Sequence, residues 1–549
     1  MPLQKNQVLT LQVERLSSDG SGVAHSPEGE TVFIPGAAPG DEARVRIVKD
    51  CKRYAFGILD EVLKPSPDRI PVDCAVAGPC GGCSLRHLDY AAELRAKQEN
   101  VADAFARIGG LDVPVLPIVG SPEIDRYRNK VQFPVGTDKA GRPCIGFYAG
   151  RTHRIVPCPD CRLQPGVLNE IGNTLCAFFA EKGIHPYNEE TGKGLVRHIF
   201  LRRGAHSGQI MVCLVSTRAK LPSAEELCTR LKEAFPDIVT ILLNVNAKNT
   251  NVILGSETHT LYGQGYIEDT LCGVPVQLGP LSFYQVNTLA AEQLYGIAAE
   301  YAQLTSDDLL LDLYCGMGTI GLSMADHCRE LVGVEIVPEA IESAKANASR
   351  MGAAVSAKSR FFCADAGQAA AQLAAEGLHP DVVMLDPPRK GCDEATLSAV
   401  VRMAPRRVVY VSCNPATAAR DAAWLEQNGY HAEKVQPVDL FPRTKHCETV
   451  VLLSKGEVDS KKIRVEFSLE DMDMSEFQDG ATYTQIKDYV LEHSGLKVSN
   501  LYISQIKRKC GIEVGKNYNL PKSEDSRQPQ CPPEKEKAIR EAFKYFGMI

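Results

Sequence analysis

The stretch from Leu309 to Glu335, LLLDLYCGMGTIGLSMADHCRELVGVE, constrains the fold more than any other part of the 549-residue chain. Residues 309–313 are apolar apart from Asp312, as expected of a strand that is covered on both faces. A glycine turn with the spacing GxGxxG follows, and then a helical run and a second apolar strand that ends on Glu335. Glycines let the backbone approach a ligand closely, and a carboxylate about 20 residues further on can bind ribose hydroxyls. The stretch therefore predicts a β-α-β unit that suits either NAD or S-adenosylmethionine.

Two more apolar strands end in residues that can do chemistry. Residues 381–385 (DVVML) run into DPPRKG, which begins with Asp386, and residues 408–411 (VVYV) run into SCNP, which contains Cys413. A third candidate stretch, PRTKHCE, ends on Glu448 just before another strand. Catalytic groups of open parallel sheets lie at the carboxyl ends of the strands, so we expect Cys413 to face the cofactor.

Together, DLYCGMGT, DPPRKG, SCNP and the stretch around His446 and Glu448 resemble the RNA uracil-5-methyltransferase family, whose methyl donor is S-adenosylmethionine. The segment SFYQVN, residues 282–287, is similar to the opening of that family's methyltransferase domain. The resemblance implies that Cys413 adds to C6 of a uracil ring and that Glu448 later removes the proton from C5. Such a target base must be flipped out of its stack, which favours RNA loops. The cofactor positions that the resemblance implies are Gln285, Tyr314, Thr319, Glu335, Asp365 and Asp386.

The first 63 residues carry short alternating apolar runs that are separated by Gly, Pro and Asp turns. This pattern is typical of a small all-β barrel. The segments 20–24 (GSGVA) and 34–36 (IPG) resemble the TRAM domain, an RNA-binding module of the OB type. Its basic residues are either candidates for phosphate contacts or part of a solvated hairpin; they are Arg44, Arg46, Lys49, Lys52 and Arg53.

A set of cysteines indicates a second kind of site. Cys74, Cys80 and Cys83 form the pattern C-x5-C-G-G-C, and Cys161 follows well downstream. Three close thiolates and one distant thiolate can hold an iron–sulfur cluster, and zinc is the main rival because it also accepts four thiolates. The cluster-bearing branch of the family has the same pattern, so the resemblance implies a 4Fe–4S cluster. Cys158 lies only three residues from Cys161, which we assign because it precedes Arg-Leu-Gln as the family's ligand does.

These observations predict an α/β protein with a Rossmann-like, S-adenosylmethionine-dependent methyltransferase domain at residues 281–456. An OB-like β-barrel (TRAM) is expected at 1–63, and a central α+β, RNA-binding domain with the cysteine cluster at 64–280. Within the central domain, Arg128 and Lys130 resemble the family's substrate-binding stretch.

Two further segments complete the predicted organisation. A helix over residues 85–108, which Gly109-Gly110 would stop, is expected to pack on the methyltransferase domain. Residues 457–549 form a small C-terminal appendage of unknown role, with helical stretches near 484–492 and 533–545.

Composition limits the partners and the compartment. The net charge of −7 is not that of a generally basic RNA binder, so RNA contacts must use local patches. Nineteen cysteines in a chain of this length fit a reducing cytoplasm better than a disulfide framework. No signal peptide and no apolar run of about 18 residues is found, so we expect no membrane contact. We expect a cytoplasmic monomer with no protein partner.

The barrel and the cysteine set favour the 23S ribosomal RNA branch of the family, with C5 of a uridine as the target. A transfer-RNA uracil-5-methyltransferase is the alternative, although that branch usually lacks both features. An amino-methyltransferase would carry an N/D-P-P-Y/F motif, whereas Arg389 follows the prolines here. A non-catalytic RNA-binding factor is a further alternative, against which the complete set of family residues speaks. The sequence does not identify the uridine that is modified.

Overall fold

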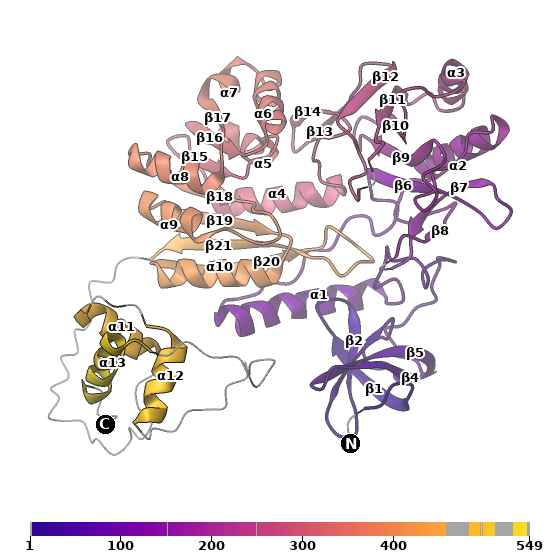
Figure 1. Cartoon of the computed structure of the whole chain (residues 1–549). Helices are drawn as coiled ribbons and strands as arrows, with labels where there is room; N and C mark the ends of the chain where they lie inside the picture. Colours follow the sequence, from indigo (N-terminus) through magenta and orange to yellow (C-terminus); the bar gives the residue numbers. More distant parts are fainter. Residues whose placement is uncertain are drawn as a thin grey trace. The chain divides into compact units, whose positions relative to one another are not determined.

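The computed structural model describes residues 3–150, 152–248, 250–456, 483–494, 496, 498–510 and 531–545. The chain separates into two compact units, Met1–Val458 and Asp459–Ile549 (Figure 1). In the part of the chain that is described, none of the helices combines the length and the hydropathy that a bilayer crossing requires.

The N-terminal strands close into a five-stranded barrel, as the alternating sequence predicts. The strand order is β1-β2-β3-β5-β4, and β1 pairs with β4 to complete the ring. Every second residue faces inward: Val32 and Ile34 are buried, whereas Phe33 between them is partly exposed. The strands are β1 (Val8–Leu16), β2 (Ser21–His25), β3 (Thr31–Pro35), β4 (Glu42–Asp50) and β5 (Tyr54–Lys64).

The middle part of the sequence forms a seven-stranded sheet in the order β12-β11-β10-β9-β6-β7-β8. Helices α2 (Gly166–Glu181) and α3 (Ala224–Ala234) cover it and share one hydrophobic core with its strands. A separate hairpin, β13-β14, follows. The strands are β6 (Lys130–Thr137), β7 (Pro143–Tyr148), β8 (Ile155–Pro157), β9 (Val196–Arg203), β10 (Ile210–Ser216), β11 (Ile238–Val245), β12 (Glu257–Tyr262), β13 (Ile267–Leu271) and β14 (Val274–Leu278).

The helix predicted from residue 85 begins later and has an irregular end. Helix α1 (Tyr90–Ala104) starts after Asp89, whose side chain accepts a hydrogen bond from the Ala92 amide and caps the helix. One turn of π-helix, Phe105–Gly109, extends it, and Gly110 ends it with a φ of 62°. Phe105 is buried in the same core as the strands of the C-terminal sheet described next.

The C-terminal half of the first unit is a doubly wound sheet in the order β17-β16-β15-β18-β19-β21-β20. The first five strands of this order are parallel to one another, and β21 is antiparallel to both of its neighbours, β19 and β20. Its strands are β15 (Leu309–Leu313), β16 (Glu330–Glu335), β17 (Ser359–Cys363), β18 (Val382–Leu385), β19 (Arg407–Ser412), β20 (Tyr430–Val438) and β21 (Glu448–Lys455). Its helices are α4 (Thr288–Ala302), α5 (Thr319–Ser323), α6 (Pro338–Arg350), α7 (Ala353–Lys358), α8 (Ala366–Ala375), α9 (Glu394–Met403) and α10 (Pro415–Gln427), with a 3₁₀ turn at Ala325–His327.

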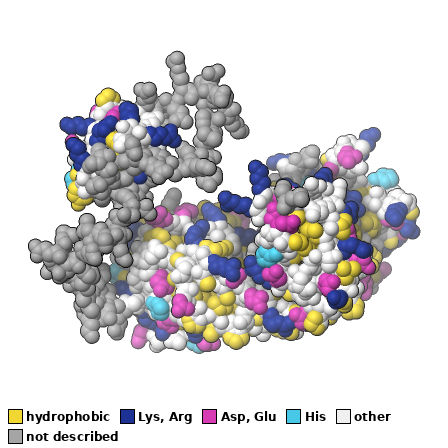
Figure 2. Space-filling view, turned by 90° about the horizontal axis from the view of Figure 1, so that it is seen from below, with side chains coloured by type: hydrophobic (Ala, Val, Ile, Leu, Met, Phe, Trp, Pro, Cys, Tyr) yellow, Lys and Arg dark blue, Asp and Glu magenta, His cyan; other side chains and the backbone are white. Residues whose placement is uncertain are grey.

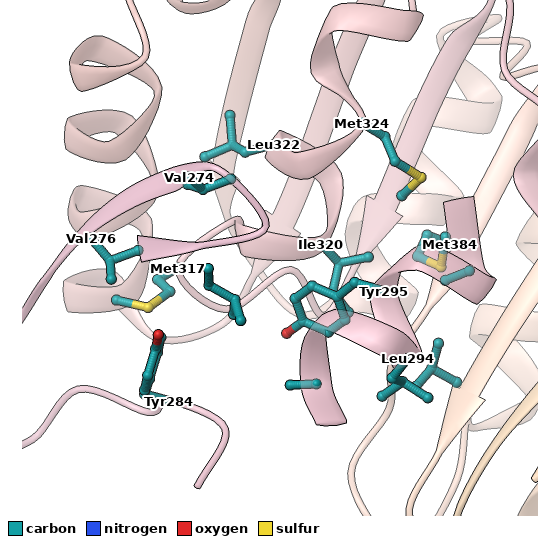
Figure 3. Close-up of a cluster of buried hydrophobic side chains, with 14 of the residues drawn as sticks. Val274, Val276, Tyr284, Leu294, Tyr295, Met317, Ile320, Leu322, Met324 and Met384 are labelled. Carbon is teal, nitrogen blue, oxygen red and sulfur yellow. The ribbon is translucent and has the colours of Figure 1, made fainter. Parts of the chain in front are cut away.

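Strand β15 shows why the predicted apolar runs lie at the centre of this sheet. Leu310 contributes to the core on one face, whereas Leu309 and Leu311 contribute to the core on the other. The first of these cores packs α4 and α5 against the sheet, and Figure 3 shows part of it around Tyr295, Ile320 and Met384. Hydrophobic cores cover both faces of the sheet, so a ligand site can form only at the loops that follow the strand ends.

The second unit has helices α11 (Tyr483–Ser494), α12 (Asn500–Lys509) and α13 (Pro533–Tyr545) among its described residues. Ile486, Ile503 and Phe543 are buried together between them. The two helices predicted near 484–492 and 533–545 correspond to α11 and α13. The domain boundaries at residues 63, 280 and 456 stay a prediction.

Candidate active site

Strand register aligns the predicted site residues along one edge of the C-terminal sheet. Leu313 pairs with Val334 on one side and with Leu385 on the other, so the chain leaves all three strands at the same level. Glu335 is the last residue of β16, Tyr314 and Asp386 directly follow β15 and β18, and Cys413 follows the next strand, β19. Glu448 opens β21, the antiparallel neighbour of β19.

The glycine turn after β15 forms an open, rigid cradle. Gly316 has a φ of 54°, and a side chain there would meet nothing within 4 Å. Its amide donates to one Glu335 oxygen at 3.1 Å, and the Val337 amide donates to the other at 2.9 Å. The carboxylate is thus fixed beside open space at a strand end, and these features fit an adenosine whose ribose hydroxyls reach Glu335.

The other predicted cofactor residues each form their own hydrogen-bond contacts. The Tyr314 hydroxyl is 3.4 Å from Thr396 Oγ1, and the buried Thr319 hydroxyl is 3.3 Å from the Tyr295 hydroxyl. Asp365 caps α8, since its Oδ1 accepts from the Gln368 amide at 3.1 Å. The half-buried Gln285 lies on the loop before α4, where its backbone carbonyl accepts from Asn129 Nδ2 at 2.7 Å.

The local sequence explains why Cys413 stands where it does. Ser412 ends β19, and the Asn414 side chain caps α10, whose first residue is Pro415. Cys413 is therefore held in the short turn between a strand end and a helix N-terminus. It is half-buried, and burial raises the pKa of its thiol, as does the Glu448 carboxylate, whereas the Arg389 guanidinium lowers it.

Two carboxyl groups close to Cys413, those of Glu448 and Asp386, have pKa values near neutral pH. Glu448 is buried, and loss of water raises its pKa to about 8, to which the charge of Asp386 also contributes. Burial raises the pKa of Asp386 to about 7. A carboxyl group with such a pKa can both accept and release a proton at neutral pH.

Asp312 is a site residue to which the sequence analysis gave no function. It is buried, and its Oδ2 accepts from the Gly321 amide at 3.0 Å, which ties the first turn of α5 to β15. Burial raises its pKa to about 8. The sequence signal for such a role is an acidic residue inside an otherwise apolar strand. Its neighbour Glu335 is at the adjacent strand end, so the cradle holds two carboxylates.

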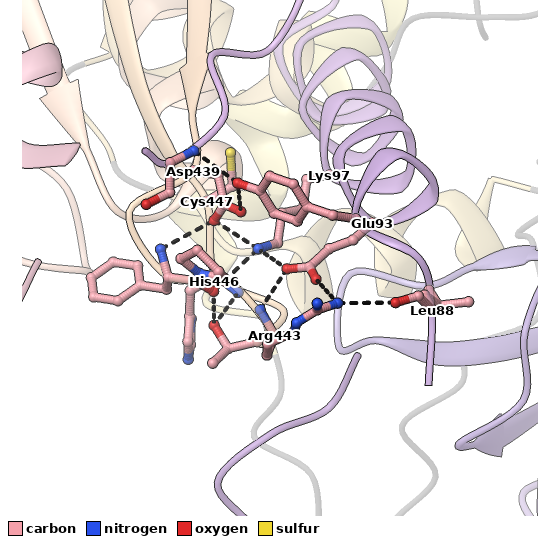
Figure 4. A network of polar contacts seen from close by, with 12 residues as sticks. Leu88, Glu93, Lys97, Asp439, Arg443, His446 and Cys447 are labelled. Atoms are coloured by element: carbon pink, nitrogen blue, oxygen red, sulfur yellow. Dashed lines mark hydrogen bonds and ion pairs between the residues drawn. The ribbon is translucent and has the colours of Figure 1, made fainter. Parts of the chain in front are cut away.

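The loop that leads into Glu448 is tied to helix α1 by a buried ionic network (Figure 4). Lys97 Nζ donates to Glu93 Oε1 at 2.7 Å and to Asp439 Oδ1 at 2.8 Å. The Arg443 amide donates to the same Glu93 oxygen at 2.7 Å. His446 lies within this loop, and burial together with nearby cations lowers its pKa to about 4, so it is neutral at pH 7. The bonded residues on α1 and on the loop are more than 300 positions apart in the sequence. No local sequence pattern could therefore predict these bonds.

A cavity of about 530 Å³ opens beside Cys413. Its walls come from the turn that contains Cys413, from helix α1 with its π-turn, and from the N-terminal barrel. Lys445 and His446 line it from the loop before β21, and Arg389 from the DPPRKG turn. The cavity is large enough for a nucleotide, and its basic residues suit phosphate groups.

The predicted metal ligands share a smaller cavity of about 60 Å³. Cys74, Cys80, Cys83 and Cys161 all line it, and so does Cys158. The Cys158 and Cys161 thiols are adjacent, and a hydrogen bond between them lowers the pKa of Cys161. Cys161 lies in the loop after β8, not on a strand.

Within the described residues, no group of three or more His, Cys, Asp and Glu side chains has the geometry to hold a metal ion. Arg128, which the sequence suggested as an RNA contact, lines the cysteine cavity. Lys130 is half-buried in β6, and burial lowers its pKa to about 8.

Comparison with known proteins gives consistent matches over most of the chain. The family described as tRNA (Uracil-5-)-methyltransferase matches residues 276–456, and the TRAM domain matches residues 2–59. An uncharacterized RNA methyltransferase of Halalkalibacterium halodurans is 44% identical over 453 residues, which are 82% of this chain and 98% of that protein. One of Clostridium tetani is 41% identical and covers 83% of this chain and 98% of its own. The solved structure of Pyrococcus abyssi tRNA (uracil-54, C5)-methyltransferase in complex with S-adenosyl-L-homocysteine is 27% identical, with a TM-score of 0.65, and covers 81% of this chain and 100% of that one.

Proposed function

The chain belongs to the RNA uracil-5-methyltransferase family, and from this premise we propose that it methylates C5 of a uridine in 23S ribosomal RNA through a covalent bond to Cys413. As a member of that family it is an enzyme that uses S-adenosylmethionine and acts on RNA. The observation that supports the covalent route most is the pairing of β19 with β21, which sets a thiol and a buried carboxyl group side by side at the cofactor edge.

The proposed reaction begins with Cys413. Its thiolate forms a bond to C6 of the uracil ring, and the electrons of the C5–C6 double bond move onto C5 and the O4 carbonyl as an enolate. Bound S-adenosylmethionine would supply an electrophilic methyl group, and its S–CH3 bond would break to leave S-adenosylhomocysteine. C5 takes up the methyl group, and the Glu448 carboxylate then removes the proton from C5. The electrons of the broken C5–H bond restore the double bond as the Cys413–C6 bond breaks, which returns the thiolate.

The residues around the glycine cradle are proposed to hold the cofactor. Glu335 would accept hydrogen bonds from the ribose hydroxyls, because both its oxygens keep free lone pairs after their backbone contacts. Asp386 lies between this carboxylate and Cys413 in the row of strand ends, where it would orient the methyl donor. The remaining members of the proposed set are Gln285, Tyr314, Thr319 and Asp365.

A 4Fe–4S cluster is proposed for Cys74, Cys80, Cys83 and Cys161. A single zinc ion requires four donors within about 2.3 Å of one point, whereas each thiolate of a cluster binds its own iron atom. Four thiols that line one cavity supply the all-cysteine donor set that such a cluster uses. The cluster would join the loop after β8 to residues 74–83 and so stabilise the fold; no step of methyl transfer uses it.

The choice of 23S ribosomal RNA is supported by the barrel and the cysteine set together. The likeness to the transfer-RNA enzyme of Pyrococcus abyssi favours transfer RNA as a second candidate. Incubation of the protein with labelled S-adenosylmethionine and either RNA, followed by nucleoside mass spectrometry, distinguishes them. We expect labelled 5-methyluridine in 23S ribosomal RNA. Label in transfer RNA alone would select the second candidate, and label on an exocyclic amine would reject both.

A further inference from the structure

Three aromatic side chains form a cluster on the outer face of the N-terminal barrel. The ring centroids of Phe33, Tyr54 and Phe56 lie 5.6 to 5.8 Å from one another. Their neighbours along the strands, Val32 and Ala55, are fully buried, whereas Tyr54 is 41% exposed. The aromatic cluster is therefore outside the barrel core, and the core does not need it for packing.

Cations surround this aromatic cluster, but only some are free to bind a ligand. Arg44 forms an ion pair with Glu61, and Arg46 with Asp60, so these two charges are already neutralised within the barrel. Lys49, Lys52 and Arg53 form no ion pair with any residue that the structure describes.

The three free cations are adjacent to the rings. Lys49 is paired in register with Phe56 across β4 and β5, and Lys52 and Arg53 form the turn that leads into Tyr54. Acidic and basic side chains are interspersed on the face of the molecule that Figure 2 shows.

The aromatic cluster is continuous with the catalytic cavity. Phe33 and its strand neighbour Thr31 line the same 530 Å³ cavity as Cys413. Lys445, in the loop before β21, adds positive charge to this cavity, whereas the charge of Arg15 is paired with Asp103. A chain that carries flat rings and regular negative charge would thus find matching groups from the barrel face to the reactive thiol.

We propose that Phe33, Tyr54 and Phe56 stack the unpaired bases that flank the target uridine, while Lys49, Lys52 and Arg53 contact their phosphates. Base stacking on aromatic side chains needs exposed base faces, so this surface selects a single strand over a duplex. That the flanked base is a methylation target rests on the proposed function. That the barrel surface stacks unpaired bases does not depend on the proposed function.

The test measures binding without catalysis. The full-length protein with Cys413→Ala is titrated with fluorescein-labelled oligouridine, of the roughly 4–16 nucleotides that one such barrel covers, and with the same strand annealed to oligoadenylate. Adding Tyr54→Ala should weaken binding of the single strand about 5- to 100-fold, the usual range for loss of a stacked base, and leave the duplex nearly unchanged. Tyr54→Trp should retain the affinity, which shows that a ring is required.

Ile58→Ala is the matched control, because Ile58 is 48% exposed on the same strand but lies outside the aromatic cluster and the cavity. It should change the affinity less than twofold. An unchanged affinity in Tyr54→Ala, or an equal loss for duplex and single strand, would overturn the proposal.

Ultraviolet cross-linking of the oligouridine should label peptides that contain Phe33 or Tyr54, and labelling only outside the barrel would also overturn it. Because no methyl transfer is measured, these results are independent of whether the enzyme methylates uridine.

Discussion

Cys413 and Glu448 are brought together by a single pair of strands. Ser412, the last residue of β19, pairs with Thr449, the second residue of β21, so that Cys413 and Glu448 are next to this pair on opposite strands. The strand register therefore places the proposed nucleophile and the proposed base opposite each other. Most residues of both strands are buried, and the two strands are paired along their length.

Glu448→Gln should leave the attack by Cys413 possible and prevent removal of the C5 proton. A methylated RNA–protein adduct should then accumulate, because the Cys413–C6 bond breaks only after that proton has left. Denaturing gel electrophoresis with labelled RNA detects the adduct. If the variant migrates only as free protein while it still binds the cofactor, another group is the base.

The rate of methylation should rise with pH through the neutral range and above pH 8. Burial raises the pKa of both Glu448, to about 8, and Cys413, and both groups act in their ionised form. Arg389 lowers both pKa values, so Arg389→Gln should move the rise to higher pH. Single-turnover rates from pH 6 to 9.5 measure this. Lys390→Gln removes the neighbouring exposed charge and should leave the profile in place; an equal shift in both variants would contradict the assignment.

Glu335→Ala should weaken S-adenosylmethionine binding by about 1–3 kcal/mol through loss of charged hydrogen bonds to the ribose. RNA affinity should change little, because Glu335 is on the cofactor side of the strand ends. Glu330→Ala, at the opposite end of the same strand, removes only an ion pair with Arg360 on the surface and serves as the control. Calorimetry that finds equal losses of cofactor and RNA affinity would indicate a folding defect instead.

Protein purified without oxygen should be brown and should contain about four iron atoms per chain if the cysteines hold one cluster. Cys161→Ser should bleach it and lower solubility, whereas Cys158→Ser should keep the colour. Absorption spectra and elemental analysis measure both effects. Stoichiometric zinc in a colourless preparation would reject the cluster, and bleaching by Cys158→Ser alone would identify Cys158 as the fourth ligand.

The sequence was sufficient for the parts of the fold that short patterns encode. Strand β15 has the predicted bounds, Leu309–Leu313, because an apolar run before a glycine turn leaves little choice of where a buried strand ends. The barrel was also predicted, since its alternation has a period of two. Helix α1 begins later than the sequence predicts, because its start depends on one cap, Asp89, among several polar residues.

Contacts between distant segments could not be predicted in this way. The bond from Lys97 to Asp439 joins positions far apart in the chain, and nothing around either residue indicates its partner. The barrel wall of the catalytic cavity depends on such contacts. The ion pair between Arg44 and Glu61 likewise removed a basic residue that the sequence suggested for phosphate binding. Side-chain pairing, more than secondary structure, decides which charges remain available.

Covalent catalysis by Cys413 is tested most directly with RNA in which 5-fluorouridine replaces uridine. A base cannot remove fluorine from C5 as it removes a proton, so the bond between Cys413 and C6 should persist after methyl transfer. Intact-mass spectrometry should then find one RNA, with one added methyl group, on each wild-type protein that carries cofactor. Cys413→Ala should form no adduct while it still binds S-adenosylmethionine, and Cys228→Ser, in helix α3 of the central region, should form it normally. An adduct in Cys413→Ala would contradict the mechanism. So would a wild-type protein that methylates ordinary uridine RNA but forms no adduct with the 5-fluorouridine RNA.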